Sequence, residues 1–181
     1  MFEKTLTGFL DEVGAKTSAP GGGAVAAVTV SLAAALAEMA ARFSGKQWDR
    51  ADEVVTRARE LRTRAAPLAE ADAEAYGAVI AARGTPAHDE ALSLAADVPL
   101  TIAQAAADVG ELAAELASHG NPNLRGDAAT SALLAEAAAR AAANLVEINL
   151  AHKNGDERIT RARELASSAG AAAKRALSAP A

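Results

Sequence analysis

Cysteine is missing from this sequence of 181 residues, and aromatic side chains are scarce. The absence of cysteine excludes disulfide bonds, thiolate catalysis and cysteine-ligated zinc. Aromatic residues make up only 3% of the chain, and the formal net charge is −5. No basic stretch interleaved with aromatic residues occurs, so a nucleic-acid partner is not expected.

Patterns for secretion and for membrane insertion are lacking as well. The N-terminal stretch MFEKTLTGFLDEVG does not show the basic segment followed by an apolar run that is typical of a signal peptide. Residues 21–37 are uncharged, but they are mostly Gly and Ala and end at Glu38. That run falls short of the ~18 or more strongly apolar residues that indicate a spanning helix. We therefore predict a cytoplasmic protein that does not bind a membrane.

Alanine is what the sequence has in excess, at 53 of the 181 residues. Alanine is the strongest helix former, and its small side chain lets helices approach closely. Apolar residues make up 51% and charged residues 23%, which is typical of a globular chain. The length fits one domain. We predict a single all-α domain that covers residues 1–181.

The spacing of apolar residues and of helix-breaking residues predicts a bundle of roughly seven helices. Pro67 lies inside the third of these helices and is expected to kink or break it. The second helix is apolar nearly all round, which predicts a buried, central position. The two glycine-rich joints, 20–23 and 120–127, are expected close together or at the two ends of the bundle. Helices are predicted over residues 4–13, from the glycines to residue 43, over 50–82, over a short segment that ends at residue 96, over 97–119, over 127–152 and over a last segment that ends near residue 177.

Three consecutive glycines, Gly21, Gly22 and Gly23, open the second helix. A helix N-terminus without side chains exposes backbone N–H groups, and the helix dipole favours a negative group there. Glycine is also compatible with a tight turn followed by close helix packing. We favour a ligand contact, because three glycines after Pro20 exceed what a turn needs. The pattern matches neither the phosphate loop nor the dinucleotide fingerprint.

Polar residues on the other predicted helices and loops provide further candidates. Asp72 and Tyr76 are four residues apart and share a helix face, so a buried Asp72 would be a candidate general acid or base. Alternatively, Asp72 is an ordinary charged residue exposed to solvent. Asn121, Asn123 and Asp127 lie in the loop GNPNLRGD, where they either bind a heterocycle or form a turn and a helix cap.

An asparagine and the three histidines are the remaining polar groups of a kind that occurs in binding sites. Asn149 lies on an otherwise apolar helix, where its side chain is expected to hydrogen-bond either to another helix or to a ligand. The three histidines show no pair of metal-binding motifs, and Glu115 with His119 stands alone. No metal site is predicted.

Taken together, these stretches resemble the cyclodeaminase/cyclohydrolase family, which includes the C-terminal domain of formiminotransferase-cyclodeaminase and free-standing bacterial relatives. The resemblance covers nearly the whole chain and is specific in its combination of motifs. It is carried by SAPGGGAVAA, FSGKQW, EADAEAYGAVIAA, DVPL and HGNPNLRGDAATSALLAEAAARAAANLVEINL, in this order.

The resemblance implies an all-helical homodimer that acts on a tetrahydrofolate one-carbon derivative. A cyclodeaminase closes 5-formimino-tetrahydrofolate to 5,10-methenyl-tetrahydrofolate and releases ammonia. Methenyltetrahydrofolate cyclohydrolase is the alternative, and a non-catalytic helical interaction module is a further one. No cofactor or metal beyond the folate itself is expected.

The resemblance also assigns roles to individual residues. Asp72 is the first choice for proton transfer and Asp127 the second. In the family pattern a serine usually precedes that aspartate and the loop at Lys46 is richer in lysine, whereas this chain has Gly126, Gln47 and Trp48. Lys46 and the glycine loop are expected to hold the acidic tail of the folate, while Trp48 or Tyr76 either covers the pterin ring or belongs to the core. The expected substrate-binding residues are Pro20, Gly21, Gly22, Gly23, Lys46, Asn121, Asn123 and Asn149.

Overall fold

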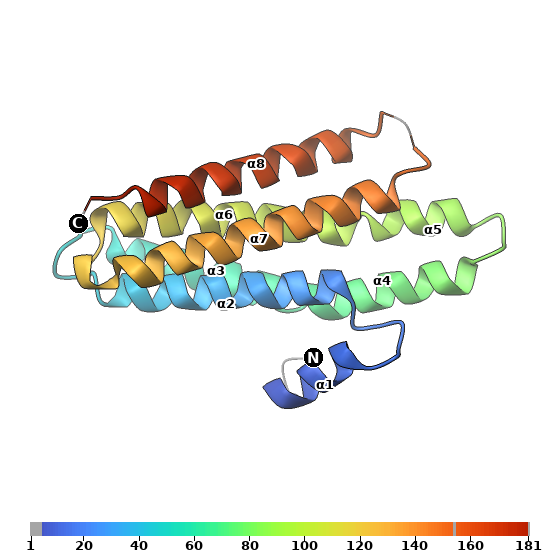
Figure 1. Ribbon diagram of the computed structural model, residues 1–181, viewed down its shortest axis with the longest axis horizontal. Helices are drawn as coiled ribbons and strands as arrows, with labels where there is room; N and C mark the ends of the chain where they lie inside the picture. The colour runs from blue at the N-terminus through green and yellow to red at the C-terminus, as the bar shows by residue number, and fades with distance from the viewer. Residues whose placement is uncertain (1–4, 154, 181) are drawn as a thin grey trace.

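The computed structural model describes residues 5–153 and 155–180, and every regular element in these ranges is a helix (Figure 1). The predicted all-α class is confirmed. Pro67 divides the helix that was expected over residues 50–82, so the described residues form eight α-helices rather than about seven. The elements are α1 (Leu6–Gly14), α2 (Gly22–Arg42), α3 (Ala51–Ala65), α4 (Leu68–Ala82), α5 (His88–Ala95), α6 (Asp97–His119), the short 3₁₀ helix η1 (Pro122–Leu124), α7 (Arg125–Asn149) and α8 (Glu157–Leu177).

The long helices α2, α6, α7 and α8 form a bundle whose core consists largely of alanine. Figure 1 shows these helices running along the longest axis of the molecule, with α3 and α4 beside α2. Because alanine side chains are small, the helix backbones come close, and larger side chains such as Ile102 and Leu61 fill the remaining space. Gly110 on α6 marks one such approach, since an added Cβ atom would lie 3.7 Å from the backbone of Ala169 on α8.

Helix α2 is buried against α3, α4, α6 and α7, as predicted for the central helix. One stripe of it, however, faces outward and is apolar. Val25, Leu32 and Phe43 lie along this stripe with exposed fractions of 38%, 56% and 63%. By length and composition α2 is also apolar enough to cross a membrane, contrary to the expectation from its charge-free run, but 61% of its most apolar window is buried inside the bundle.

The first helix lies apart from the bundle, to which it is joined by residues 15–21 (Figure 1). Thr5 caps α1 by accepting a hydrogen bond from the N–H of Gly8. Leu6 and Leu10 are exposed on this helix, whereas Phe9 is buried. The predicted start of the helix at residue 4 lies outside the described residues.

Helix α7 begins two residues earlier than predicted and ends at Asn149 rather than near 152. Asp127 therefore lies within the first turn of α7 and does not cap it, because the 3₁₀ turn η1 leads directly into the helix at Arg125. Asn121 caps η1 rather than α7: its side chain accepts a hydrogen bond from the N–H of Asn123.

We expect the core to reject a larger side chain. Ala139→Leu, at a fully buried position of α7, should lower the free energy of unfolding by about 1–3 kcal/mol, because the close helix contacts leave no room. Ala137→Leu, at an exposed position of the same helix, is the control and should change it by less than about 0.5 kcal/mol. Chemical denaturation measures both, and equal effects would contradict the packing described here.

Candidate active site

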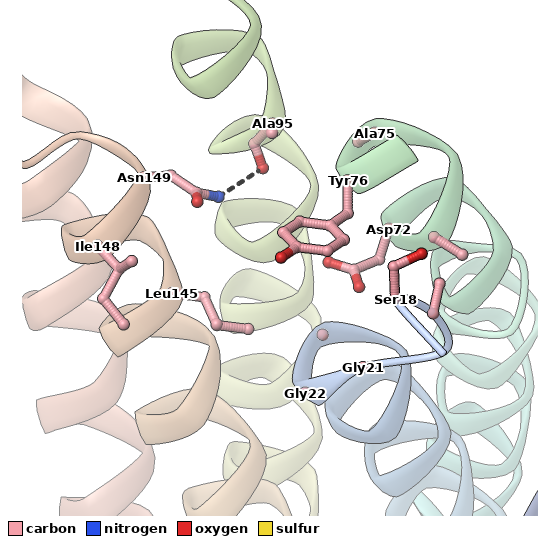
Figure 2. Close-up of a pocket in the computed structure, with 13 residues that line it drawn as sticks. Ser18, Gly21, Gly22, Asp72, Ala75, Tyr76, Ala95, Leu145, Ile148 and Asn149 are labelled. Atoms are coloured by element: carbon pink, nitrogen blue, oxygen red, sulfur yellow. Dashed lines mark hydrogen bonds between the residues drawn. The ribbon is translucent and has the colours of Figure 1, made fainter. Parts of the chain in front are cut away.

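A cavity of about 280 Å³ opens where the N-terminus of α2 faces α4, the end of α5 and the end of α7 (Figure 2). Its walls combine apolar side chains with a small number of polar groups, which is the usual make-up of a small-molecule site. The lining residues are Ser18, Ala19, Gly21, Gly22, Gly23, Asp72, Ala73, Ala75, Tyr76, Ala95, Leu145, Ile148 and Asn149.

The carboxylate of Asp72 is the only acidic side chain among the described residues that line this cavity. It projects from α4 toward the first turn of α2, where its Oδ2 accepts a hydrogen bond of 3.1 Å from the N–H of Ala24. Burial raises the pKa of Asp72 above its ordinary value, and the hydrogen bond from Ala24 only partly opposes this shift. Asp72 is therefore a partly desolvated carboxylate whose proton affinity suits acid–base chemistry.

The three glycines beside this carboxylate differ in how much space surrounds their Cα atoms. A Cβ atom on Gly23 would lie 1.9 Å from Oδ1 of Asp72, so the carboxylate can occupy its place only above a glycine. On Gly22 the nearest atom would be Cδ1 of Leu145 at 3.9 Å, and on Gly21 no atom lies within 4 Å. Within residues 5–153 and 155–180, the N–H groups of Gly22 and Gly23 have no hydrogen-bond partner, so they remain available to a ligand.

The opposite wall is formed by α7 and by the end of α5. Leu145 and Ile148 present apolar surface to the cavity, and Asn149 lies beside them (Figure 2). The side-chain Nδ2 of Asn149 donates a hydrogen bond of 3.1 Å to the carbonyl oxygen of Ala95. Tyr76 lies one turn after Asp72 on α4 and closes another side of the cavity. The cavity therefore offers apolar surface with a small number of polar groups at its edge.

The other predicted site residues lie at the far end of the bundle. The backbone N–H of Asn121 donates to Oγ of Ser44, and its side-chain Nδ2 donates to the carbonyl of Phe43, just after the C-terminus of α2. The pocket is at the N-terminus of α2, and a 21-residue helix is ~30 Å long. The single chain therefore does not bring Asp127, Lys46, Asn121 and Asn123 to the cavity around Asp72.

Pro20 and Trp48 also lie outside the cavity lining. Pro20 belongs to the same segment as the lining residues Ala19 and Gly21 but is not one of them. Trp48 packs at the far end, where its ring lies 6.0 Å from that of His119, centroid to centroid. Of the two predicted aromatic candidates, only Tyr76 is in place to contact a ligand.

Sequence reasoning missed the apolar wall of the cavity. Leu145 lies three residues before Ile148 and four before Asn149, which was predicted, so it shares a face of α7 with both. This spacing was visible in the sequence, but only the packing of α7 against α5 shows that the face borders a cavity. Within the part of the chain that the structure describes, no group of three or more His, Asp or Glu side chains is placed to hold a metal ion.

Comparison with known proteins places the chain in a family. Residues 5–169 match the family model described as formiminotransferase-cyclodeaminase, so the chain belongs to that family. It is 32% identical over 174 residues to formimidoyltransferase-cyclodeaminase of Mus musculus, an alignment that covers 86% of this chain and 32% of the mouse protein. The chain thus spans about a third of the length of that relative.

Two other similar proteins have lengths close to that of this chain. Methenyltetrahydrofolate cyclohydrolase of Methylorubrum extorquens is 33% identical over 164 residues, which cover 81% of this chain and 79% of that protein. The crystal structure of formiminotetrahydrofolate cyclodeaminase from Thermotoga maritima superposes with a TM-score of 0.92 at 28% identity, and covers 98% of this chain and 96% of that one.

We expect alanine substitutions to separate the roles of two neighbouring glycines. Gly23→Ala should lower the free energy of unfolding by about 1–3 kcal/mol, because the new methyl group displaces the Asp72 carboxylate from the N–H of Ala24. Gly22→Ala should leave stability unchanged or raise it by up to about 1 kcal/mol, since Ala restricts the unfolded chain and its methyl group meets only Leu145, at van der Waals distance. Denaturant titration of both variants would refute this assignment if Gly23→Ala were as stable as Gly22→Ala.

Proposed function

We propose that the chain is a formiminotetrahydrofolate cyclodeaminase, which converts 5-formimino-tetrahydrofolate to 5,10-methenyl-tetrahydrofolate and ammonia. The observation that carries this proposal is the Asp72 carboxylate, partly buried in a cavity beside the unbonded N–H groups of Gly22 and Gly23. The names of the relatives and the 0.92 TM-score to a cyclodeaminase support the substrate class.

In the proposed reaction the N10 nitrogen of the folate attacks the carbon of a protonated formimino group on N5. A C–N10 bond forms, and Asp72 accepts the proton that N10 releases. Asp72 then returns this proton to the former imine nitrogen, whose bond to carbon breaks so that ammonia leaves. The positive charge stays on the methenyl bridge, and the protons balance. A carboxyl with a raised pKa suits this exchange, because it holds an accepted proton more strongly than an exposed aspartate does.

The remaining groups of the cavity would hold the ring system. Leu145, Ile148 and Tyr76 offer apolar and aromatic surface, while the N–H groups of Gly22 and Gly23 and the amide of Asn149 offer polar contacts to the edges of a pterin. Fixing N5 and N10 in a closing geometry supplies part of the rate by proximity. We propose that no cofactor or metal beyond the folate takes part, since the reaction forms one C–N bond, breaks another and moves protons, with no change of oxidation state.

Methenyltetrahydrofolate cyclohydrolase is the second candidate function. The 33% identity to the Methylorubrum extorquens cyclohydrolase favours it, because that protein has a similar length. In this reaction Asp72 would instead activate a water that attacks the methenyl carbon. A helical interaction module without catalysis would bind the folate but not convert it, and the raised pKa of Asp72 argues against that reading.

We further propose that the protein is a cytoplasmic homodimer that pairs along the exposed stripe of α2. Val25 and Leu32 are seven residues apart and Phe43 follows eleven residues later, about two and three helical turns, so the three side chains lie on one apolar face that suits packing on a second helix. In an antiparallel pair, the end of the second copy that carries Asn121 and Asp127 would face the cavity of the first. Such a pairing would unite the residues that one chain keeps apart.

Replacing Asp72 by asparagine should lower kcat by about 10²–10⁴-fold, because proton transfer is lost while the shape of the side chain is kept. Stability at neutral pH should stay equal or rise. The folded-state pKa is raised, so the charged form is penalised above that pKa, and asparagine removes the penalty. The assay follows methenyl absorbance and ammonia release from 5-formimino-tetrahydrofolate.

The pH dependence provides the control for this prediction. In the wild type, kcat/KM should rise with pH through a pKa above the ordinary value for aspartate, and the variant should lack this limb. Turnover close to that of the wild type in Asp72→Asn would remove Asp72 from its role. Conversion of methenyl-tetrahydrofolate alone would favour the cyclohydrolase.

Introducing a charge into the stripe of α2 should break the proposed dimer. Leu32→Glu places a carboxylate at the centre of the seam, and we expect light scattering after size exclusion to give half the wild-type mass, with turnover reduced at least tenfold. Leu177→Glu, at a similarly exposed leucine at the end of α8, should change neither the mass nor the turnover. A monomeric wild type would contradict the proposal.

A further inference from the structure

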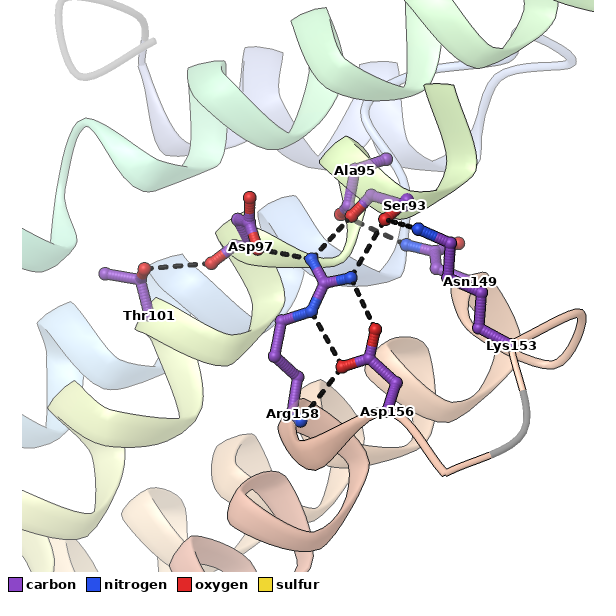
Figure 3. A network of polar contacts seen from close by, with 8 residues as sticks. All are labelled: Ser93, Ala95, Asp97, Thr101, Asn149, Lys153, Asp156 and Arg158. Atoms are coloured by element: carbon purple, nitrogen blue, oxygen red, sulfur yellow. Dashed lines mark hydrogen bonds and ion pairs between the residues drawn. The ribbon is translucent and has the colours of Figure 1, made fainter. Parts of the chain in front are cut away.

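Arg158, in the first turn of α8, uses every N–H donor of its guanidinium group (Figure 3). Nε and one Nη2 hydrogen bind the two carboxylate oxygens of Asp156, at 3.0 and 2.8 Å. Nη1 donates to the carbonyl oxygen of Ser93 at 2.8 Å and to Oδ1 of Asp97 at 2.6 Å. The second Nη2 hydrogen binds Oγ of Ser93 at 2.9 Å. With five donors satisfied and a side chain only 25% exposed, the guanidinium has one fixed position.

These contacts hold together two segments that are about 60 residues apart in the sequence. One is the corner between α5 and α6, which contains Ser93 and Asp97, and the other is the start of α8. Lys153, in the turn before α8, adds a hydrogen bond of 2.7 Å to Oγ of Ser93. Helix α5 has only eight residues and little buried surface of its own. Besides the packing of α5 against α4, the hydrogen bonds of the arginine therefore contribute to fixing this corner.

The corner in turn orients a residue of the cavity. The carbonyl of Ala95, two residues after Ser93, accepts the hydrogen bond from Nδ2 of Asn149. A carbonyl oxygen can only accept, so the NH₂ end of the amide must face Ala95 and the Oδ1 end is left over. Ala95 and Asn149 both line the cavity (Figure 2). Asn149 therefore offers the ligand an acceptor, and the matching ligand group is an N–H donor.

We propose that Arg158 is a positioning residue, which fixes the α5–α6 corner so that Asn149 presents its Oδ1 atom to an N–H group of the substrate. The inference rests on the proposed function in one respect: a pterin carries such N–H groups on its pyrimidine ring. Arg158 does not line the cavity, so it acts only through Ser93 and Ala95.

The test compares Arg158→Lys with Arg163→Lys. Lysine keeps the charge but has three donors on a flexible stem, so it cannot hold Asp156, Ser93 and Asp97 at once. Arg163 on the same helix makes two hydrogen bonds of 2.9 Å to Glu147 and none to the α5–α6 corner. We expect KM for the folate substrate to rise about tenfold in Arg158→Lys with kcat changed less than threefold, and both constants to stay unchanged in Arg163→Lys.

A substrate analogue that lacks the 2-amino group on the pyrimidine ring gives a readout that a general loss of structure would not move. Wild type should bind it about tenfold more weakly than the parent compound, whereas Arg158→Lys should no longer distinguish the two. An unchanged KM in Arg158→Lys, or full discrimination in that variant, would overturn the proposal. So would an equal loss in both lysine variants.

Solvent exchange of the Asn149 side-chain amide, measured by ¹⁵N nuclear magnetic resonance on the free protein, separates this proposal from the proposed function. The hydrogen bond to Ala95 should slow exchange in wild type, and Arg158→Lys should speed it at least fivefold. A wild type that converts no folate refutes the proposed function, and the exchange rates still decide the positioning role. Equal rates in wild type and variant refute the positioning role even if the folate is converted.

Discussion

The hydrogen bond from the N–H of Ala24 to the carboxylate of Asp72 is the contact on which the candidate site depends. It joins the first turn of α2 to α4, and it is possible only because Gly23 has no side chain. Gly22 and Gly23 line the cavity beside this contact, and in the described residues their N–H groups have no hydrogen-bond partner. A carboxylate with raised pKa and a pair of bare backbone donors thus arise from one local arrangement.

Two aspartates at helix N-termini show how the surroundings of a carboxylate determine whether it has a structural role or can exchange a proton. Asp156 caps α8 and pairs with Arg158, which lowers the pKa of Asp156 to about 2. Asp72 also meets a helix N-terminus, but no arginine or lysine in the described part of the chain forms an ion pair with it, and burial raises its pKa. Asp156 therefore stays charged and fixes the corner of α5 and α6, whereas Asp72 is able to exchange a proton.

The alanine-rich core explains both the rigidity of the bundle and its exposed surface. Alanine lets α2 approach α6 and α7 closely, and the larger apolar residues of α2, such as Leu32 and Val25, remain on the outer face. A helix with one face packed on alanine and the other formed by larger apolar side chains can bury both only if a second surface covers it. The exposed stripe and the cavity lie on the same helix, so in the proposed dimer association and activity would depend on each other.

The sequence alone was enough to predict the all-α class, the break at Pro67 and six of the thirteen residues that line the cavity. Alanine content and apolar spacing suffice for the helices, and the glycines, Asp72, Tyr76 and Asn149 were predicted from motifs and a family resemblance. Tertiary structure alone decided which glycine must lack a side chain, because that depends on where α4 places Asp72. Only the structure shows that Asn121 and Asp127 lie a full length of α2 away from the cavity, because the motifs do not indicate in which direction each helix runs through the bundle. The role of Arg158 could not be predicted from the sequence, because its partners at the α5–α6 corner are about 60 residues distant in the chain. Only the packing of α8 brings them into contact.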